Sequence, residues 1–308
     1  MIIDAHCDVL WKLLNDSSLD FYKDEQDLQL NYPNMLKGDI SLQIFAIFVS
    51  PTIKSSNYKI ALQSIDDFYE KVYNQDKLIL ATSYQEIVHA QNQGKKVAML
   101  SLEGADSIEG DLAKLRIFYR LGVRAMGLTW NYANAVADGV REERGAGLTN
   151  FGKKVIAEMN RLGMIIDVSH LSEAGFWDVM ELTNTPIIAS HSNAKAICDH
   201  PRNLTDEQII AVIKNNGMIG VTFVNEFIKN ESQVSIEDLL PHIEHIASLG
   251  GIQNLGIGSD FDGASPLSGL ENASQMNHLK ELLLKKFSEK EVEGILGENW
   301  LNYFQRVL

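Results

Sequence analysis

The chain has 308 residues, a hydrophobic fraction of 45% and a formal net charge of −14 at pH 7. A chain of this length can bury a large core, and it contains no internal repeat and no Pro/Gly/Ser-rich linker, so we expect a single domain over residues 1–308. The acidic balance disfavours nucleic acid and anionic membrane surfaces as partners, because both are bound through clusters of Lys and Arg.

Short apolar or β-branched runs alternate with longer segments of helical spacing along the chain. The runs that we predict as strands span residues 2–6, 40–49, 96–103, 123–130, 164–170, 186–191, 218–223 and 254–260. The clearest predicted helices between them span residues 111–121, 150–162, 172–183 and 205–216. This alternation predicts an α/β fold, a (β/α)8 TIM barrel. A doubly wound open sheet remains an alternative, because the number of strands does not show closure.

Two segments lie outside the alternation. Residues 15–38 are polar, and we predict a loop on the active-site side of the barrel with a short helix in it. Residues 268–308 are predicted to form a C-terminal helical extension that packs outside the barrel.

The sequence also bears on localisation. Its start, M-I-I-D-A-H, has neither a basic segment nor a sustained apolar segment of a secretory signal. The longest apolar stretch, residues 40–49, is far shorter than the ~20 residues of a membrane-spanning helix. Two cysteines, Cys7 and Cys198, give no disulfide framework. We therefore expect a cytoplasmic protein.

Polar side chains follow or end many of the predicted strands. They are His6, Asp8, Glu103, His170, His191 and Asp260. The carboxyl ends of the strands of a parallel barrel converge on one face, where such barrels carry their chemistry, so these side chains are expected to meet. His6 and Asp8 are two residues apart and face the same way in a strand, whereas Cys7 faces the other way and is predicted to be a packed thiol.

Three imidazoles and three carboxylates at one mouth predict a metal site. Nitrogen and oxygen ligands suit a borderline metal such as zinc, and six groups exceed what one tetrahedral ion uses, so two ions are implied. Glu103 can bridge them with its two oxygens, with a bridging water as nucleophile. Any one of these residues alone is better explained as a capped strand-end histidine or a helix N-cap. The other histidines considered lie away from strand ends and receive no role; they are His89, His242, His245 and His278.

Seven motifs then follow one another along nearly the whole chain, from Ile3 to the closing G-E-N-W. They are D-A-H-C-D, S-L-E-G, G-L-T-N-F-G, M-I-I-D-V-S-H, S-H-S, H-P-R-N-L-T-D and G-I-G-S-D-F-D-G. Together they resemble the membrane dipeptidase (renal dipeptidase) family of binuclear zinc peptidases, peptidase family M19, among the amidohydrolase-type barrels.

The resemblance implies a zinc-dependent dipeptidase that cleaves free dipeptides with a metal-bridged hydroxide and holds two Zn²⁺ per chain. His6 and Asp8 would bind one zinc, His170 and His191 the other, and Glu103 both. Asp260 would contact the metal-bound water and carry its proton to the leaving amine. Arg202 would pair with the free carboxylate of the dipeptide, a task suited to a planar bidentate donor. The plain alternative for Arg202 is a surface arginine in a proline-containing loop.

One departure from the family pattern concerns the oxyanion donor. Animal members carry a His after the L-T of the fourth strand, whereas here Trp130 and Asn131 follow Leu128-Thr129. Trp130 and Asn131 are therefore candidate substrate-binding residues, and the donor is open among Asn131, Asn134 and zinc. The "membrane" of the family name is not carried over, because neither a secretion signal nor a lipid-anchor tail is found.

Two other functions compete with a dipeptidase. Another binuclear amidohydrolase-type enzyme, such as a deaminase or a lactam, ester or amide hydrolase, could use the same barrel. Against it, the first strand carries H-x-D in place of the usual H-x-H, and Trp130 stands where several such enzymes have a metal-bridging lysine. A non-catalytic metal-binding barrel would be favoured by a degenerate ligand position, and none is found. The sequence leaves open the preferred side chains, the stereochemistry, the physiological substrate and whether the protein is a homodimer.

Overall fold

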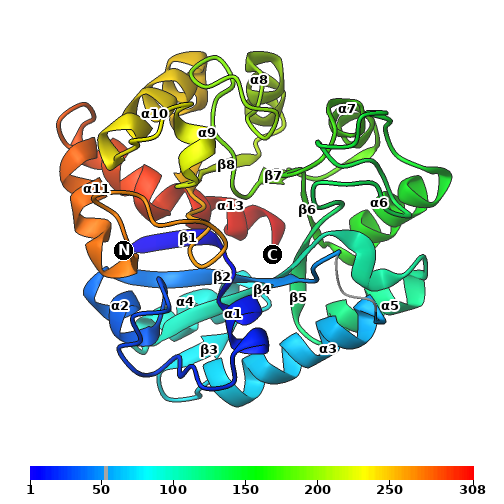
Figure 1. The fold of residues 1–308 in the computed structure, drawn as a ribbon, viewed down its shortest axis with the longest axis horizontal. Helices are drawn as coiled ribbons and strands as arrows, with labels where there is room; N and C mark the ends of the chain where they lie inside the picture. Colours follow the sequence, from blue (N-terminus) through cyan, green and yellow to red (C-terminus); the bar gives the residue numbers. More distant parts are fainter. Residues whose placement is uncertain (52–54) are drawn as a thin grey trace.

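A closed parallel barrel forms the centre of the structure, a computed structural model that describes residues 1–51 and 55–308. The sheet order is β2-β1-β9-β8-β7-β6-β5-β4-β3, and an additional pairing of β2 with β4 closes it (Figure 1). The predicted TIM barrel is confirmed, and the open sheet is excluded. The barrel strands are β1 (Ile2–Cys7), β2 (Ile40–Phe48), β4 (Lys96–Glu103), β5 (Val123–Gly127), β6 (Ile165–Asp167), β7 (Ile188–Ala189), β8 (Met218–Val221) and β9 (Leu255–Ile257).

An additional strand, β3 (Leu78–Leu80), was not predicted. It pairs with the first residues of β4, Lys96–Ala98, whereas β5 pairs with β4 from Leu100 onward. The two strands share one edge of β4, so β3 lies outside the closed ring. Its three residues are too few to give a periodic apolar pattern.

Helices surround the strands (Figure 1). The four predicted helices are present as α5 (Leu112–Arg120), α6 (Asn150–Leu162), α7 (Glu173–Leu182) and α8 (Asp206–Lys214), and each begins after a side-chain N-cap, for example Ser172 before α7. The short helix expected in residues 15–38 is α2 (Tyr32–Lys37). The remaining α-helices are α1 (Val9–Asn15), α3 (Asn57–Asp67), α4 (Tyr84–Asn92), α9 (Asn225–Ile228), α10 (Leu240–Ile246), α11 (Met276–Leu283), α12 (Glu289–Glu293) and α13 (Asn299–Val307).

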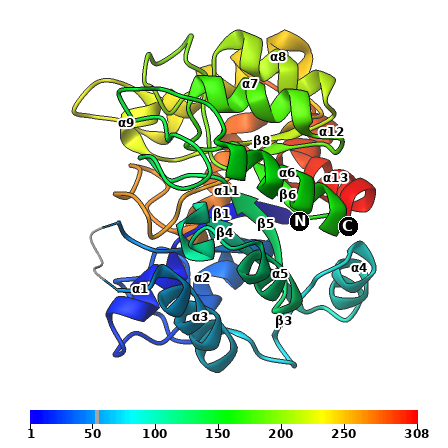
Figure 2. The ribbon, with the colours of Figure 1, turned by 90° about the vertical axis from the view of Figure 1, so that its right-hand side faces the viewer.

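The last helix, α13, covers the N-terminal end of the barrel instead of packing in the outer ring. Trp300, Tyr303 and Phe304 are fully buried and belong to the same apolar cluster as inward-facing strand residues such as Ile3 and Leu42. The Trp300 indole N–H donates to the carbonyl of Ile257 at 3.1 Å. Figure 2 shows α13 on the side where β1 begins. The expectation that the whole tail packs outside the barrel is therefore wrong for α13.

A bulge in β1 sets the direction of its last side chains. Asp4 pairs with Gln43 and Cys7 with Phe45, so three steps along β1 match two steps along β2. The extra residue turns His6 toward the mouth of the barrel, although Ile3 and Ala5 face the interior before it. Cys7 then packs, fully buried, in the outer apolar cluster, which confirms the prediction of a packed thiol.

Candidate active site

His6 lies among three carboxylates at the carboxyl end of the barrel. Its Nε2 atom is 3.7 Å from an oxygen of each of Asp8, Glu103 and Asp260. These four side chains come from the ends of β1, β4 and β9, as the sequence predicts for converging parallel strands.

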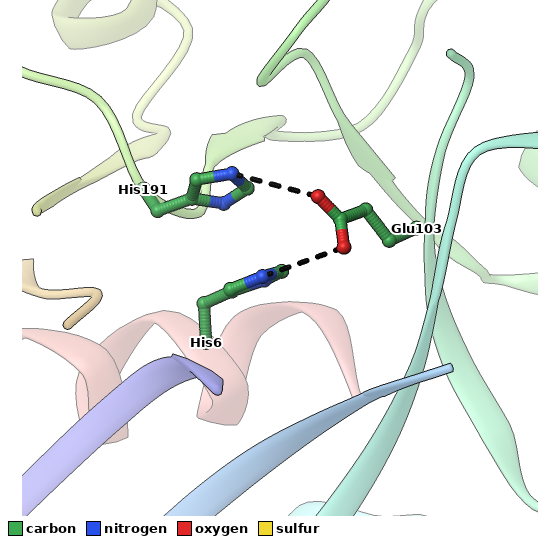
Figure 3. Close-up of side chains that lie close together, drawn as sticks. All are labelled: His6, Glu103 and His191. Atoms are coloured by element: carbon green, nitrogen blue, oxygen red, sulfur yellow. Dashed lines mark ion pairs between the residues drawn. The ribbon is translucent and has the colours of Figure 1, made fainter. Parts of the chain in front are cut away.

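Glu103 connects this group to the other two histidines. Its Oε2 atom faces His6, whereas its Oε1 atom lies 2.9 Å from His170 Nε2 and 3.9 Å from His191 Nε2. Figure 3 shows the carboxylate between the His6 and His191 rings, with one oxygen directed at each. A carboxylate in this position can bind one ion with each oxygen.

The unpaired atoms of this cluster fit metal ligation. His6 Nε2 and Asp8 Oδ1 are buried without a hydrogen-bond partner among the described residues. His170 Nε2 and His191 Nε2 lie 2.8 Å apart and face each other. Two sets of three potential ligand atoms each lie within 4.8 Å of one another, and His6 belongs to both: His6, Glu103 and His191, and His6, Asp8 and Asp260. Imidazole nitrogens and carboxylate oxygens are ligands that zinc accepts.

The outward nitrogens of two histidines are held by neighbouring side chains. His170 Nδ1 is 2.9 Å from Asn131 Oδ1, and His191 Nδ1 is 2.7 Å from Ser190 Oγ. The Ser190 hydroxyl donates to a carboxylate oxygen of Asp167. When Nδ1 carries the proton in these contacts, Nε2 presents a lone pair to the centre, which is the arrangement of metal-bound histidines. Sequence reasoning missed Asp167 and Ser190, although both stand within the quoted I-I-D and S-H-S motifs.

Burial and mutual charge shift the pKa values of these groups. Burial lowers the pKa of His6, but the carboxylates of Glu103, Asp8 and Asp260 outweigh it and raise the pKa to about 10. Burial, reinforced by the Asp8 charge, raises the pKa of Asp260 to about 8 and that of Glu103 well above its usual range. Burial lowers the pKa of His170 well below its usual range, and the charge of Arg202 adds to the effect. Carboxylates crowded in this way favour a cation among them.

Two site residues have backbone angles that non-glycine residues rarely adopt. His170 has φ of 67° and Asp260 has φ of 66°. The strands predicted over residues 164–170 and 254–260 end earlier than expected, at Asp167 and Ile257. His170 and Asp260 therefore lie beyond the strands, in the turns that follow them. The left-handed turn redirects each side chain into the mouth, and strain of this kind is common at functional sites.

A cavity of about 410 Å³ lies over the cluster. Its lining combines carboxylates and histidines of the cluster with aromatic and charged residues from the surrounding loops. The lining residues are Asp8, Trp11, Phe48, Glu103, Trp130, Asn131, Arg141, His170, His200, Val224, Glu226, Phe227, Asp260, Gly263, Ala264 and Ser265. Sequence reasoning assigned no role to Trp11, Phe48, Arg141, His200, Glu226 or Phe227; only His200 stood in a quoted motif, H-P-R-N.

Arg202 is buried beside the cluster, with 3% of its surface exposed, so it is not a surface arginine. One guanidinium nitrogen donates to the carbonyl of His191 at 3.2 Å, and the group lies 5.1 Å from the centre of the Phe227 ring. Its Nε atom has no hydrogen-bond partner among the described residues. Arg202 lines a neighbouring cavity of about 340 Å³, which also reaches His170.

The two asparagines considered as oxyanion donors differ in their surroundings. The Asn134 amide group donates to the carbonyl of Leu128 at 2.9 Å and to Asp106 at 3.0 Å, so it ties the loop after β5 to the segment after β4. Asn131 lines the cavity and contacts His170. Of the two, only Asn131 is placed to meet a substrate.

The four histidines that the sequence analysis set aside are paired elsewhere. His242 is fully buried, accepts from the Ala194 amide at 3.1 Å and contacts the Ile228 carbonyl at 2.8 Å, so it is a hydrogen-bonded core histidine. The other three contact residues outside the cavity: His89 contacts Gln93, His245 contacts Asp206 and His278 contacts Gly269.

Sequence comparison places the chain among known peptidases. A family model described as membrane dipeptidase (peptidase family M19) matches residues 1–308. The chain is 33% identical over 294 residues to the dipeptidase aclJ of Aspergillus oryzae (strain ATCC 42149 / RIB 40), a match that covers 90% of this chain and 70% of the relative.

Two solved structures have nearly the same fold. The metallo peptidase of Rhodobacter sphaeroides, liganded with a phosphinate mimic of the dipeptide L-Ala-D-Ala, superposes with a TM-score of 0.93 at 26% identity and covers 100% of this chain and 99% of its own. The dipeptidase AC, a metallo peptidase of family M19, superposes with a TM-score of 0.93 at 27% identity over 99% of this chain and 98% of its own.

Within residues 1–51 and 55–308, no helix combines the length and the apolar character needed to cross a membrane.

Proposed function

This chain belongs to the membrane dipeptidase family, peptidase family M19, and we therefore propose that it is a zinc-dependent dipeptidase that hydrolyses free dipeptides. The observation that carries this proposal is the placement of Glu103, whose two oxygens face His6 on one side and His170 and His191 on the other. This geometry supports two adjacent metal sites that share one carboxylate.

The residues divide into two ligand groups in this proposal. His6 and Asp8 would hold one zinc ion, His170 and His191 would hold the other, and Glu103 would contribute an oxygen to each site. When bound, the metal pair would activate a water molecule as nucleophile and polarise the peptide carbonyl. The contacts of Asn131 and Ser190 orient the second pair of imidazoles for this role.

Asp260 and Arg202 act on the water and the substrate. Asp260 lines the cavity, and its Oδ1 atom is 3.7 Å from His6 Nε2, so it can take a proton from the attacking water and give it to the leaving amine. Arg202 is buried beside the cluster with an unpaired Nε atom, so its guanidinium can pair with the carboxylate of a dipeptide.

Metal content and turnover, measured on the same zinc-loaded preparation, test the proposal. We expect about two zinc ions per chain. We also expect free dipeptides to be hydrolysed to their two amino acids. Glu103→Ala should lower both the zinc content and the rate, whereas Glu143→Ala, at an exposed carboxylate, should change neither. Two bound ions without dipeptide hydrolysis would favour another amidohydrolase-type activity. One ion or none would contradict the binuclear site.

A further inference from the structure

Three aromatic rings form one wall of the 410 Å³ cavity. Trp11 and Phe48 meet edge to face with ring centres 5.4 Å apart, and the Phe48 and Trp130 ring centres are 5.3 Å apart. All three side chains are half-buried, so part of each ring surface stays accessible. We call Trp11, Phe48 and Trp130 the aromatic wall.

The strand order places the aromatic wall across the barrel from Arg202. Trp11 follows β1, Phe48 ends β2 and Trp130 follows β5, whereas Arg202 follows β7 and Phe227 follows β8. Around the ring the strands run β1, β2, β4, β5, β6, β7, β8 and β9, so β8 is diametrically opposite β4, which lies between β2 and β5. Glu103 reaches from the end of β4 to the histidines that follow β6 and β7, so the cluster extends from the side of the aromatic wall toward the side of Arg202.

This placement determines how a dipeptide would lie, given the proposed function on which the inference rests. Two extended residues span at most roughly 7 Å. Arg202 lines the neighbouring 340 Å³ cavity, and His170 lines both cavities. A substrate with its carboxylate at Arg202 and its peptide bond over the metal cluster therefore directs its N-terminal residue into the 410 Å³ cavity, toward β1, β2 and β5. We propose that the aromatic wall receives the side chain of the N-terminal residue, so that the enzyme prefers dipeptides beginning with an apolar or aromatic residue.

The opposite side of the cavity offers a poorer surface for an apolar side chain. Phe227 is 9% exposed, His200 stacks on its ring at 4.6 Å, and Arg202 lies 5.1 Å from the ring centre. Its ring is therefore largely covered by polar groups. An apolar side chain removes more surface from water on the aromatic wall than against Phe227, so the preference applies to the first residue and not to the second.

Matched pairs of dipeptides test this inference. We would measure kcat/KM of the zinc-loaded enzyme for Gly-Gly, Phe-Gly and Gly-Phe. The kcat/KM for Phe-Gly should exceed that for Gly-Gly by about 10- to 100-fold, the range of discrimination that apolar pockets achieve. The kcat/KM for Gly-Phe should exceed that for Gly-Gly by a smaller factor. Trp130→Ala should cut the Phe-Gly to Gly-Gly ratio about fivefold or more, and Trp130→Phe should keep most of it.

A surface variant and a binding measurement serve as controls. Trp177→Ala, at an exposed ring on α7, should leave the ratio unchanged. Phosphinate dipeptide mimics with Phe or Gly in the first position should show the same order of inhibition constants, a readout that does not need turnover. The inference would be overturned, with dipeptides still cleaved, by a Phe-Gly to Gly-Gly ratio of kcat/KM near one or by a larger gain for Gly-Phe than for Phe-Gly. A ratio that is unchanged in both Trp130→Ala and Phe48→Ala would overturn it as well. A zinc-loaded enzyme that cleaves no dipeptide would overturn the proposed function as well.

Discussion

His191 Nδ1 lies 2.7 Å from the hydroxyl of Ser190, and that hydroxyl donates to the carboxylate of Asp167. Asp167 is itself fixed, because it accepts from the backbone amides of Ser169 and Ser190 at 3.0 Å each. The buried Asp167 carboxylate thus sets the tautomer and the ring orientation of His191, a proposed metal ligand, through two successive hydrogen bonds.

Removing the Ser190 hydroxyl should weaken one of the two metal sites. We expect Ser190→Ala to lower zinc affinity at the His170/His191 site by about 10- to 100-fold, because the His191 ring loses its partner. Competition with a chromogenic chelator measures this. Ser192 flanks the same histidine, and its buried Oγ has no hydrogen-bond partner among the described residues, so Ser192→Ala is the matched control. Equal losses in both variants would contradict the role of Ser190.

Asp260→Asn should separate metal binding from catalysis. The amide keeps the size of the side chain but cannot carry a proton, so the rate should fall by ~10²–10⁴-fold while most zinc remains bound. Zinc content and kcat, measured on the same sample, decide the question. Near wild-type turnover with both ions bound would refute the proton-carrier role.

Arg202→Ala should discriminate against free dipeptides specifically. Losing one partner of a buried charge pair should cost roughly 2–4 kcal/mol of binding. The effect should nearly vanish for a C-terminally amidated substrate, which has no carboxylate. Comparing wild type and variant on a dipeptide and its amide checks this, and equal losses on both substrates would shift weight to a broader amide hydrolase. Arg202→Lys keeps the charge but not the fork of donors, and should give an intermediate loss.

Gly263→Ala should damage the site while preserving the fold. A Cβ atom at this position would lie 2.1 Å from Asp8 Oδ2 and 2.3 Å from Asp260 Oδ1. Both atoms are ends of side chains, so we expect them to swing aside, with loss of zinc and activity. The unfolding temperature measured with excess chelator should change little, since neither carboxylate supports the apolar core. A variant that keeps full zinc content would show that these carboxylates are free to move without consequence.

Chelation should lower the stability of the wild-type protein. Ions that bind only the folded state stabilise it by mass action, by about 2.7 kcal/mol per site at a free concentration 100 times Kd. EDTA should therefore lower the unfolding temperature of wild type, and lower that of Glu103→Ala much less. An identical shift in both proteins would mean that the stabilising ions bind elsewhere.

The sequence predicted the barrel and the convergence of its polar strand ends because both follow from local patterns. Alternation of strands and helices is visible without coordinates, and strand-end polar residues such as Glu103 must then share one face. The bulge in β1 could not be predicted, because it depends on the register with β2. The different roles of Asn131 and Asn134 were equally hidden, since they depend on the partner that each side chain reaches. Asn134 donates to the Leu128 carbonyl and to Asp106, whereas the Asn131 side-chain oxygen contacts the His170 ring. The position of Arg202 required the fold, because burial of a loop arginine leaves no periodic signal.

The seating of α13 against the barrel interior has a consequence for biosynthesis. β1 is synthesised before the other strands, yet it pairs with β9 and shares its core with Trp300 and Phe304, which follow all the strands in the sequence. Most of the chain must therefore be synthesised before the ring of strands can close, and contacts so distant in sequence form slowly. Until then Ile3 and its inward-facing neighbours lack their final partners, and transiently exposed apolar strands of this kind are prone to aggregation.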